Sequence, residues 1–579
     1  MKFLLLSLFA GIVSAFGFAP LGLWPLTLAA FAGLMWLVER APSLRGALAR
    51  GYWFGVGNFV LGLNWIATAF TYQSAMPVWL GWIAVVLLSF YLAVYPAMAA
   101  GLAWRWGRSG VDILPLPMGE RVGVRGLDDR GRPPTSGTLT QPLPLQDRPP
   151  DDPRIRSGNP LRERALYRGS RHSLSESRSG HMSFVLIFAA SWLVTEWLRA
   201  TMFTGFAWNP IGVTLLPTRL AYLSTMIGTY GLSAIALLLA GGLLLLLHRQ
   251  RKRAIVLLAT IAVAGLLVPL GGSRTLPASA VPLRIVQPNI GQQDKWKEGF
   301  EARNLALLKR LSASREQRPR LLLWPEAAVT DPLENGLAYR RHRMAAAELR
   351  KEVGEMIGPN DLLLTGGVTW QSADGSDVTS ATNSVFAMNR GGRILGRYDK
   401  AHLVPYGEYL PARPILSRLG LSRLAPGDID FDSGPGPQSL VLPLVGKVGF
   451  QLCYEIIFSG EVIDRSNRPS ILFNPSNDAW FGAWGPPQHL AQARLRALEE
   501  GMPVLRSTPT GISAVIDAEG RLLHSLPWRT AGVIDAKLPA PKPPTLFARG
   551  GNILPFLFAL LLVGIAIAVH RKDGYGAHI

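Results

Sequence analysis

One segment of the sequence reads Val448-Gly449-Phe450-Gln451-Leu452-Cys453-Tyr454-Glu455, and it holds the only cysteine of the 579-residue chain. The residues before Cys453 predict a buried β-strand, and a side chain at a strand end has a fixed position from which it can face a cleft. The alternative is an inert, buried cysteine that acts as a small apolar side chain. A nucleophilic cysteine needs an activating neighbour, so the rest of the sequence has to supply one.

Two other segments place charged side chains next to constrained backbone. The first, Leu321-Leu322-Leu323-Trp324-Pro325-Glu326, puts a carboxylate at the end of a predicted apolar strand. This carboxylate can accept a proton from a thiol, or it can simply favour a helix N-terminus. The second, residues 397–408, brings Lys400, His402 and Glu408 together around proline and glycine. Lys400 can stabilise a thiolate or an oxyanion, although a single lysine is more often a solvated surface residue.

Residues 274–549 predict a layered α/β domain, because short apolar runs alternate there with helical stretches. The predicted strands are Leu283–Val286, Leu321–Trp324, Leu362–Val368, Ser384–Met388, Val448–Tyr454, Ile471–Asn474 and Ile512–Asp517. The predicted helices are Phe300–Ser314, Leu337–Gly354 and Gln488–Gly501.

Most of the remaining sequence consists of uncharged runs of membrane-spanning length. Residues 3–38 and 51–104 are each long enough for two spans at about 20 residues per crossing, with breaks near 17–22 and 71–77. Single spans are expected from residue 182 onward and within 220–247, 254–273 and 550–569, which gives eight spans in total. A cleaved signal peptide is the alternative for the first run, and it would leave the other seven spans unchanged.

The positively charged loops predict the orientation of these spans. Arginine and lysine gather in residues 39–50 and 248–253 and after residue 569. Cytoplasmic loops carry an excess of such residues, so both termini are expected in the cytoplasm and the α/β domain on the periplasmic side. The expected division is spans one to four in 1–104, an insertion in 105–181, spans five to seven in 182–273, the α/β domain in 274–549, and the last span with a cytoplasmic tail in 550–579.

Composition separates this membrane interpretation from others. The net charge of +20 does not indicate a nucleic-acid partner, because only 17% of residues are charged, 49% are hydrophobic, and the positive charge lies between apolar runs. Residues 105–181 are rich in proline, glycine, serine and arginine without apolar periodicity, which predicts a disordered cytoplasmic insertion. A single cysteine excludes a cysteine-cluster metal site, and no metal or cofactor is predicted.

Together these motifs resemble a known family. Glu326, Lys400 and Cys453 resemble the Glu-Lys-Cys triad of the nitrilase (carbon–nitrogen hydrolase) superfamily. The match to one branch, the apolipoprotein N-acyltransferases, extends over nearly the whole chain except 105–181. Its motifs are similar to residues 400–409, 453–457, 476–482 and 506–508 in the α/β domain, and to residues 195–199 and 203–208 in the membrane half. Two residues, Ala207 and Pro509, differ from the pattern of the family, and both lie outside the triad.

The resemblance implies an αββα sandwich on an eight-span bundle in the bacterial inner membrane, and a two-step acyl transfer. Glu326 takes the thiol proton, Cys453 attacks a phospholipid ester to form a thioester, and Lys400 stabilises the oxyanion. The acceptor is the α-amino group of the diacylglyceryl-cysteine at the N-terminus of an apolipoprotein. Supporting residues are expected to be Glu408, Tyr454 and Glu455, with the two glutamates orienting Lys400 or the acceptor amine. Candidates for the lipid entrance are Phe206, Trp208 and Trp480.

Three other functions are compatible with parts of the sequence. A membrane-anchored amidase or nitrilase would share the triad but transfer to water. A cysteine protease would need His402 or His489 as its base. A transporter with an outer binding domain would need charged residues inside its spans, and the long apolar runs contain none.

Overall fold

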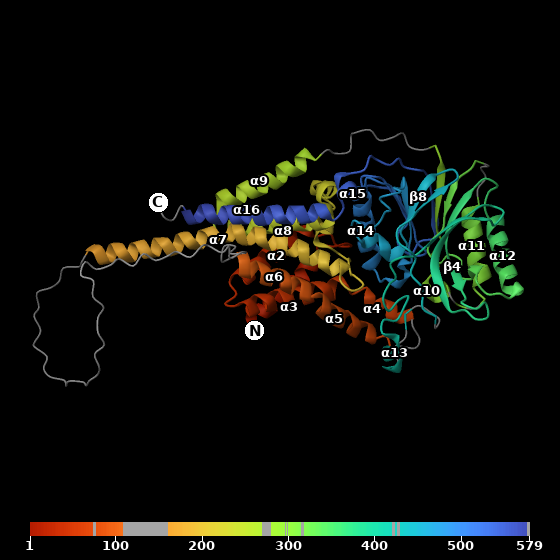
Figure 1. The fold of residues 1–579 in the computed structure, drawn as a ribbon, viewed down its shortest axis with the longest axis horizontal. Coiled ribbons are helices and arrows are strands. Elements are labelled where there is room, and N and C mark those ends of the chain that lie inside the picture. Colours follow the sequence, from red (N-terminus) through yellow and green to blue (C-terminus); the bar gives the residue numbers. More distant parts are fainter. Residues whose placement is uncertain are drawn as a thin grey trace, which may run out of the picture.

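The computed structural model consists of a bundle of long helices and a unit built from two β-sheets, which lie side by side (Figure 1). The structure describes residues 1–72, 77–107, 160–268, 280–295, 297, 299–313, 318–419, 423–424 and 429–575. Of these, residues 160–180 and 573–575 are described by their backbone alone. The helices of the bundle come from the N-terminal half and the C-terminal end of the sequence. The strands of both sheets come from the segment between them.

The helices of the bundle follow the uncharged runs of the sequence. They are α1 (Lys2–Ala15), α2 (Trp24–Glu39), α3 (Leu44–Gly62), α4 (Ile66–Ala69), α5 (Leu80–Leu92), α6 (Val94–Gly107), α7 (Pro160–Thr201), α8 (Ser224–Leu247), α9 (Arg251–Leu267) and α16 (Ile553–Tyr575). The first run breaks between α1 and α2, where residues 17–22 predict a break. The 3-10 turn η1 (Phe70–Tyr72) lies at the second predicted break.

The helices confirm part of the predicted set of eight membrane spans. Within the described residues, four stretches are long and apolar enough to cross a membrane, Leu80–Gly107, His181–Thr201, Arg219–Leu247 and Ile553–Lys572. The pair Leu44–Gly62 and Ile66–Tyr72, bent by 48°, would make a fifth. The three other predicted spans correspond to α1, α2 and α9, which have 14, 16 and 17 residues, fewer than the roughly 20 of a full crossing.

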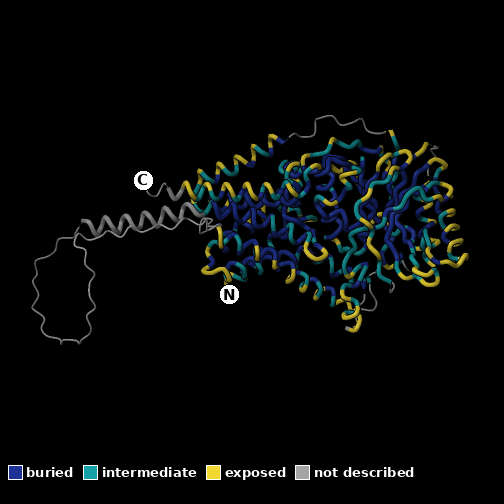
Figure 2. Tube along the Cα trace, viewed as in Figure 1, coloured by how far each residue is buried: buried dark blue, intermediate teal, exposed yellow. Residues whose placement is uncertain are grey.

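The outer faces of the bundle are apolar. Figure 2 shows exposed residues along α9 and α16. Large apolar side chains are exposed on both helices, namely Ile255, Val256, Leu266 and Leu267 on α9 and Leu557, Leu560 and Leu561 on α16. Many exposed apolar side chains of this kind are unfavourable in water and favourable against lipid chains. The exposed faces therefore agree with a bundle embedded in a bilayer.

The predicted disordered insertion is partly helical. Helix α7 begins at Pro160, so its backbone covers the end of the 105–181 segment before it enters the bundle. Extending an existing helix costs less free energy than starting one, and the apolar part of α7 supplies the stable helix to extend. Residues 108–159 lie outside the described residues.

Two sheets form the core of the second unit. The strands of the seven-stranded sheet are β1 (Pro282–Gln287), β2 (Leu321–Leu323), β3 (Pro332–Asn335), β4 (Leu362–Gln371), β5 (Ser380–Met388), β6 (Ile394–Asp399) and β13 (Gly532–Lys537), in the order β13-β1-β2-β4-β5-β6 with β3 on β4. The strands of the six-stranded sheet are β7 (Ser439–Leu442), β8 (Gly446–Phe450), β9 (Ile471–Pro475), β10 (Val504–Ser507), β11 (Ala514–Ile516) and β12 (Leu522–Ser525), in reverse numerical order. Neighbouring pairs β1–β2, β2–β4, β8–β9 and β9–β10 are parallel.

The sheets pack face to face between two helical layers. One buried cluster joins residues of both sheets, including Leu321 and Leu323 of β2 and Phe450 of β8. A second cluster packs α11 (Glu301–Ser312) and α12 (Arg340–Glu355) on the outer face of the first sheet. The outer face of the second sheet packs on α14 (Gly485–Glu500), and this cluster continues into the membrane helices. The predicted layered α/β domain is confirmed.

All seven predicted strands are present, and three of them, Leu321–Trp324, Val448–Tyr454 and Ile512–Asp517, are predicted longer than they are. The sequence predicts Val448–Tyr454 as a strand, but β8 ends at Phe450 and Cys453 begins the 3-10 turn η5 (Cys453–Ile457). Apolar character continues through this turn because all five of its residues are buried. Hydrophobicity alone therefore did not mark the end of the strand.

Candidate active site

Cys453 lies at a sharp turn directly after β8. Its φ angle is 51°, in the left-handed region that a residue with a side chain rarely adopts and that is often found at functional positions. The side chain is only 6% exposed. Burial raises the pKa of the Cys453 thiol well above its usual value, Glu326 raises it further, and Lys400 lowers it. The resting thiol is therefore protonated at neutral pH and needs a base to become a nucleophile.

Glu326 offers one carboxylate oxygen for this purpose. The residue follows β2 and is 5% exposed. Its Oε1 accepts a hydrogen bond from Nδ2 of Asn383 at 2.8 Å and lies 3.5 Å from Nζ of Lys400. Its Oε2 is buried and has no hydrogen-bond partner among the described residues. One oxygen is thus held in place, and the other is able to accept a proton.

Lys400 is a buried ammonium between two carboxylates. It directly follows β6 and is 1% exposed, and its Nζ lies 2.9 Å from Oε2 of Glu408. Burial alone would lower the pKa of Lys400, but Glu408 and Glu326 outweigh it and raise the pKa. Nδ2 of Asn383 donates to Glu408 at 2.8 Å as well as to Glu326. A permanently charged ammonium held this rigidly can stabilise an oxyanion.

Glu455 holds the backbone of the site. Its Oε1 accepts hydrogen bonds from the N–H groups of Ala401 at 2.8 Å and His402 at 3.0 Å, and its Oε2 accepts one from Leu452 at 2.7 Å. Burial raises the pKa of Glu455 to about 7, against the lowering effect of these N–H groups. Glu455 thus ties the turn at Cys453 to the loop after β6. It contacts the backbone just after Lys400, in contrast to Glu408, which contacts the ammonium.

The two histidines considered as alternative bases are bonded elsewhere. His489 places Nε2 3.0 Å from the carbonyl oxygen of Cys453 and Nδ1 3.0 Å from Oδ1 of Asp478. The Nε2 atom of His402 lies 2.7 Å from the carbonyl oxygen of Thr204. His489, which the sequence suggested only as a protease base, instead fixes the main chain of the cysteine. The geometry therefore disfavours the protease hypothesis.

Trp208 does not lie where a lipid entrance was expected. Its side chain is fully buried, and its indole N–H donates to Oε1 of Gln488 at 2.8 Å. Its ring lies 4.4 Å from that of Trp65. Because α14 carries Gln488 and the bundle carries both tryptophans, Trp208 packs the junction between the two parts of the molecule. The prediction that it lines an entrance does not hold.

The other aromatic candidates are more accessible. Phe206 is half-buried, and its ring lies 6.5 Å from that of Tyr454. The Tyr454 hydroxyl donates to the carbonyl oxygen of Gly205 at 3.2 Å, so the residue after the cysteine contacts the membrane half. Trp480 is half-buried and stands edge-on to Tyr72 at 5.9 Å. Phe206 and Trp480 therefore remain candidates for contact with lipid.

Lys295 belongs to the site although the sequence did not indicate it. It lies on the short helix α10 (Gln292–Lys295), is 4% exposed, and donates from Nζ to the main-chain oxygen of Glu326 at 2.9 Å. Burial lowers the pKa of Lys295 to about 8, opposed by the charges of Glu326 and Cys453. A lysine in a polar stretch of sequence is normally exposed, so only the three-dimensional packing reveals it.

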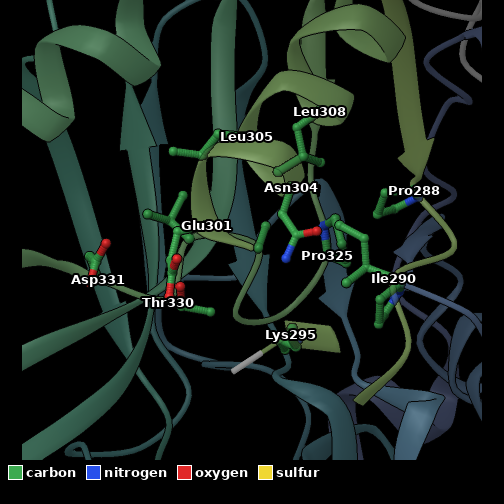
Figure 3. Close-up of a pocket in the computed structure, with 13 residues that line it drawn as sticks. Pro288, Ile290, Lys295, Glu301, Asn304, Leu305, Leu308, Pro325, Thr330 and Asp331 are labelled. Atoms are coloured by element: carbon green, nitrogen blue, oxygen red, sulfur yellow. The ribbon is translucent and has the colours of Figure 1, made fainter. Parts of the chain in front are cut away.

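A small pocket lies beside Lys295. It is lined by Ile290, Asn304, Leu305, Leu308 and Pro325, with Lys295 at its edge (Figure 3). None of the triad residues lines it. The pocket is therefore adjacent to the triad and not part of it.

Comparison with known proteins agrees with this geometry. Residues 283–542 match the family model described as carbon-nitrogen hydrolase, and residues 10–118 and 165–243 match the one described as apolipoprotein N-acyltransferase N-terminal domain. The apolipoprotein N-acyltransferase of Rhodopseudomonas palustris is 31% identical over 98% of this chain and 95% of its own length. The chain belongs to the apolipoprotein N-acyltransferase family. The proteins of the same name from Bradyrhizobium diazoefficiens and Caulobacter vibrioides are 31% and 32% identical over 98% and 97% of this chain, and 95% and 94% of their own lengths.

Family membership confirms three expectations from the sequence. The resemblance is correct, the α/β domain is of the carbon–nitrogen hydrolase type, and the family is one of bacterial acyltransferases. The assignment of individual residues to chemical steps, the eight spans and the orientation of the domain stay predictions.

Proposed function

We propose that this chain transfers an acyl group from a phospholipid to the α-amino group of the N-terminal diacylglyceryl-cysteine of apolipoproteins, through a thioester on Cys453. One observation carries the chemistry. Glu326, whose charge raises the pKa of the buried Cys453 thiol, has one oxygen bonded to Asn383 and its other oxygen unpartnered among the described side chains. This arrangement supports proton transfer from the thiol to the carboxylate.

The first step forms the acyl-enzyme. Oε2 of Glu326 accepts the thiol proton while the sulfur of Cys453 attacks the ester carbonyl carbon of the phospholipid. Lys400 stabilises the negative charge on the carbonyl oxygen. The ester C–O bond breaks, and the departing alkoxide takes the proton back from Glu326, which releases a lysophospholipid.

The second step transfers the acyl group. The neutral α-amine of the acceptor attacks the thioester carbonyl, Glu326 accepts the amine proton, and the C–S bond breaks. The thiolate recovers that proton, so the enzyme returns to its starting state with an amide as product. Both lipids would approach from the bilayer, which supports a catalytic unit mounted on apolar helices in the inner membrane with the domain on the periplasmic side.

Intact-mass analysis of the full chain in detergent tests this function. Incubation with phospholipid alone should add the mass of one acyl group to the protein, and a synthetic diacylglyceryl-cysteinyl peptide should remove it and gain that mass. A membrane-bound hydrolase would instead release free fatty acid at the same rate with or without the peptide. Absence of any adduct under turnover conditions would contradict the thioester mechanism.

A further inference from the structure

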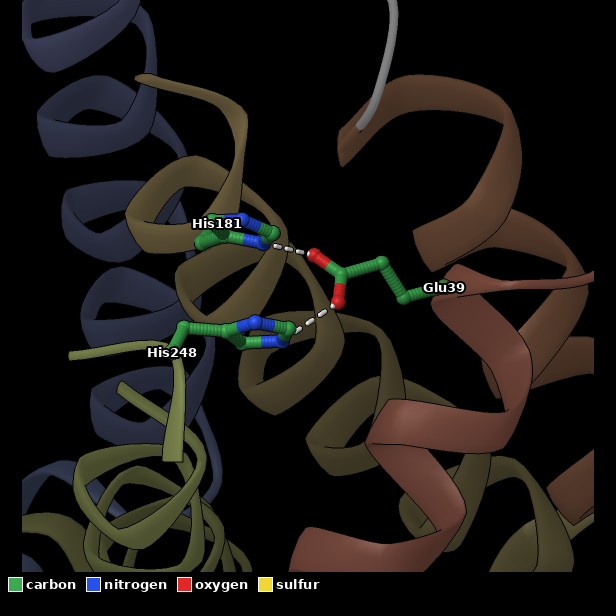
Figure 4. Close-up of side chains that lie close together, drawn as sticks. All are labelled: Glu39, His181 and His248. Atoms are coloured by element: carbon green, nitrogen blue, oxygen red, sulfur yellow. Dashed lines mark hydrogen bonds and ion pairs between the residues drawn. The ribbon is translucent and has the colours of Figure 1, made fainter. Parts of the chain in front are cut away.

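Three side chains with metal-binding atoms meet at the end of the bundle remote from the sheets. Glu39 is the last residue of α2, His248 follows the last residue of α8, and His181 lies on α7 (Figure 4). Glu39 contacts Nδ1 of His181 through Oε1 and lies 2.9 Å from Nε2 of His248 through Oε2. About 20 residues of α7, or roughly 30 Å of helix, separate His181 from the catalytic unit. The cluster is therefore independent of the active site.

We propose that Glu39, His181 and His248 bind a divalent transition-metal ion, best represented by Zn²⁺. One ligand atom from each residue lies within 4.8 Å of the others. Two imidazoles and one carboxylate are a common donor set for zinc, and three protein ligands leave the fourth tetrahedral position for water. The pairs are separated by 142 and 209 residues, so no sequence motif could have shown the site.

The geometry requires only side-chain adjustment. Tetrahedral zinc with bonds of about 2.0–2.2 Å places its ligand atoms roughly 3.3–3.5 Å apart, somewhat closer than the 4.8 Å limit seen here. The two imidazole rings are stacked, with centroids 4.0 Å apart and planes at 13°, so they would tilt toward the ion. Without an ion, the carboxylate accepts one hydrogen bond from each ring. The three side chains are between 12% and 19% exposed, which leaves a path for the ion and its water ligand.

The surroundings decide which ions fit. Arg40, Arg249 and Arg251 are close in sequence to the ligands, so general electrostatic attraction for a cation is weak. Mg²⁺ and Ca²⁺ prefer several oxygen ligands, and the cluster offers a single carboxylate. Imidazole nitrogen instead suits zinc, nickel and copper. The site should therefore discriminate by direct coordination and ignore Mg²⁺ and Ca²⁺.

A bound ion would fasten three helices that are far apart in the sequence. Glu39 belongs to the first apolar region, while His181 marks the point at which the chain returns to the bundle after the 105–181 segment. Since the ion binds only when the helix ends are together, it favours the folded bundle. Zinc should then raise the thermal transition temperature of the full-length protein.

Zinc binding to the full chain in detergent, with any affinity tag removed, tests the site. After chelation and re-equilibration, the wild type should retain one Zn²⁺ per chain by elemental analysis and show a single site by calorimetry. His181→Ala and His248→Ala should each weaken binding at least tenfold, and Glu39→Gln should weaken it as well. His524→Ala is the matched control, because His524 is an exposed histidine of β12, and it should bind zinc like the wild type.

A second measurement covers variants that fold poorly. Co²⁺ in the wild-type protein should give the strong visible absorption of a tetrahedral site, and Zn²⁺ should displace it. His248→Gln, which retains a hydrogen-bonding side chain toward Glu39, should fold and lose this spectrum. The proposal is overturned if the wild type binds no zinc at 10-fold molar excess, if His248→Gln keeps the cobalt spectrum, or if Mg²⁺ raises the transition temperature as much as Zn²⁺ does.

Discussion

Asn383 holds Glu326 by a hydrogen bond of 2.8 Å from Nδ2 to Oε1. The same amide nitrogen lies 2.8 Å from Oε1 of Glu408. The two carboxylates therefore share a neutral donor, Asn383, and a charged donor, Lys400. The second oxygen of Glu326 has no partner among the described residues and can accept a proton. The separate roles of these residues lead to predictions that distinguish proton transfer, charge stabilisation and positioning.

Replacing the base should stop the first step. Glu326→Gln removes the proton acceptor while it keeps the shape of the side chain, so the buried thiol stays protonated. We expect no thioester to accumulate with phospholipid in an intact-mass assay. Unchanged thermal stability would serve as the control for folding. Formation of the thioester at the wild-type rate would overturn the assignment of Glu326 and return attention to His402.

Replacing the nucleophile should abolish transfer without unfolding the protein. Cys453→Ser keeps the size of the side chain at the strained turn, but a hydroxyl is far harder to deprotonate by a carboxylate than a thiol. No acyl adduct and no acylated peptide should form. Acylation of the peptide by the Ser variant at the wild-type rate would contradict the thioester mechanism.

Substitutions of Lys400 and Glu408 should slow different steps of the reaction. Lys400→Ala removes the charge that stabilises the oxyanion, which is typically worth roughly 10²–10³ in rate. It should slow thioester formation by that factor in a stopped-time mass assay. Glu408→Gln leaves the ammonium in place but loosens it, so we expect a smaller loss, about tenfold, and a larger effect on transfer to the peptide amine. Equal losses in both steps for the two variants would argue against this division.

Glu455 should make stability depend on pH. Its pKa is raised from 4.5 to about 7 in the folded protein, mainly by burial. Between these values the folded state binds a proton that the unfolded chain has released, so this stabilising contribution is present at low pH and is lost as the pH rises toward 7. In thermal unfolding from pH 5 to 8, the difference between the wild type and Glu455→Gln should shift in favour of the variant as the pH rises. A constant difference across this range would contradict the prediction.

The layered α/β fold and part of the candidate site could be predicted from the sequence. Glu326 and Cys453 each follow the end of a strand. Their positions could be predicted because an apolar run before a polar residue is visible in a linear sequence. The positions of Lys295 and His489 depend on which helices pack over the turn, and nothing local in the sequence records that packing. The burial of Trp208 could not be predicted for the same reason. A sequence does not distinguish an aromatic residue at a lipid surface from one at a junction of two domains.

Most of the segment between α6 and α7 should be dispensable. The family match ends at residue 118 and resumes at 165, so relatives are recognised without the residues between them. The entropy of closing a loop changes slowly with its length, and a flexible linker of about ten residues can replace a long connection at little cost. We expect a chain that lacks 119–159, joined by a glycine–serine linker, to form the thioester and acylate the peptide at rates within about twofold of the wild type. Correct insertion is checked by protease accessibility of the catalytic unit in sealed vesicles. A deletion variant that inserts and melts like the wild type but loses transfer would show that this segment takes part in the reaction.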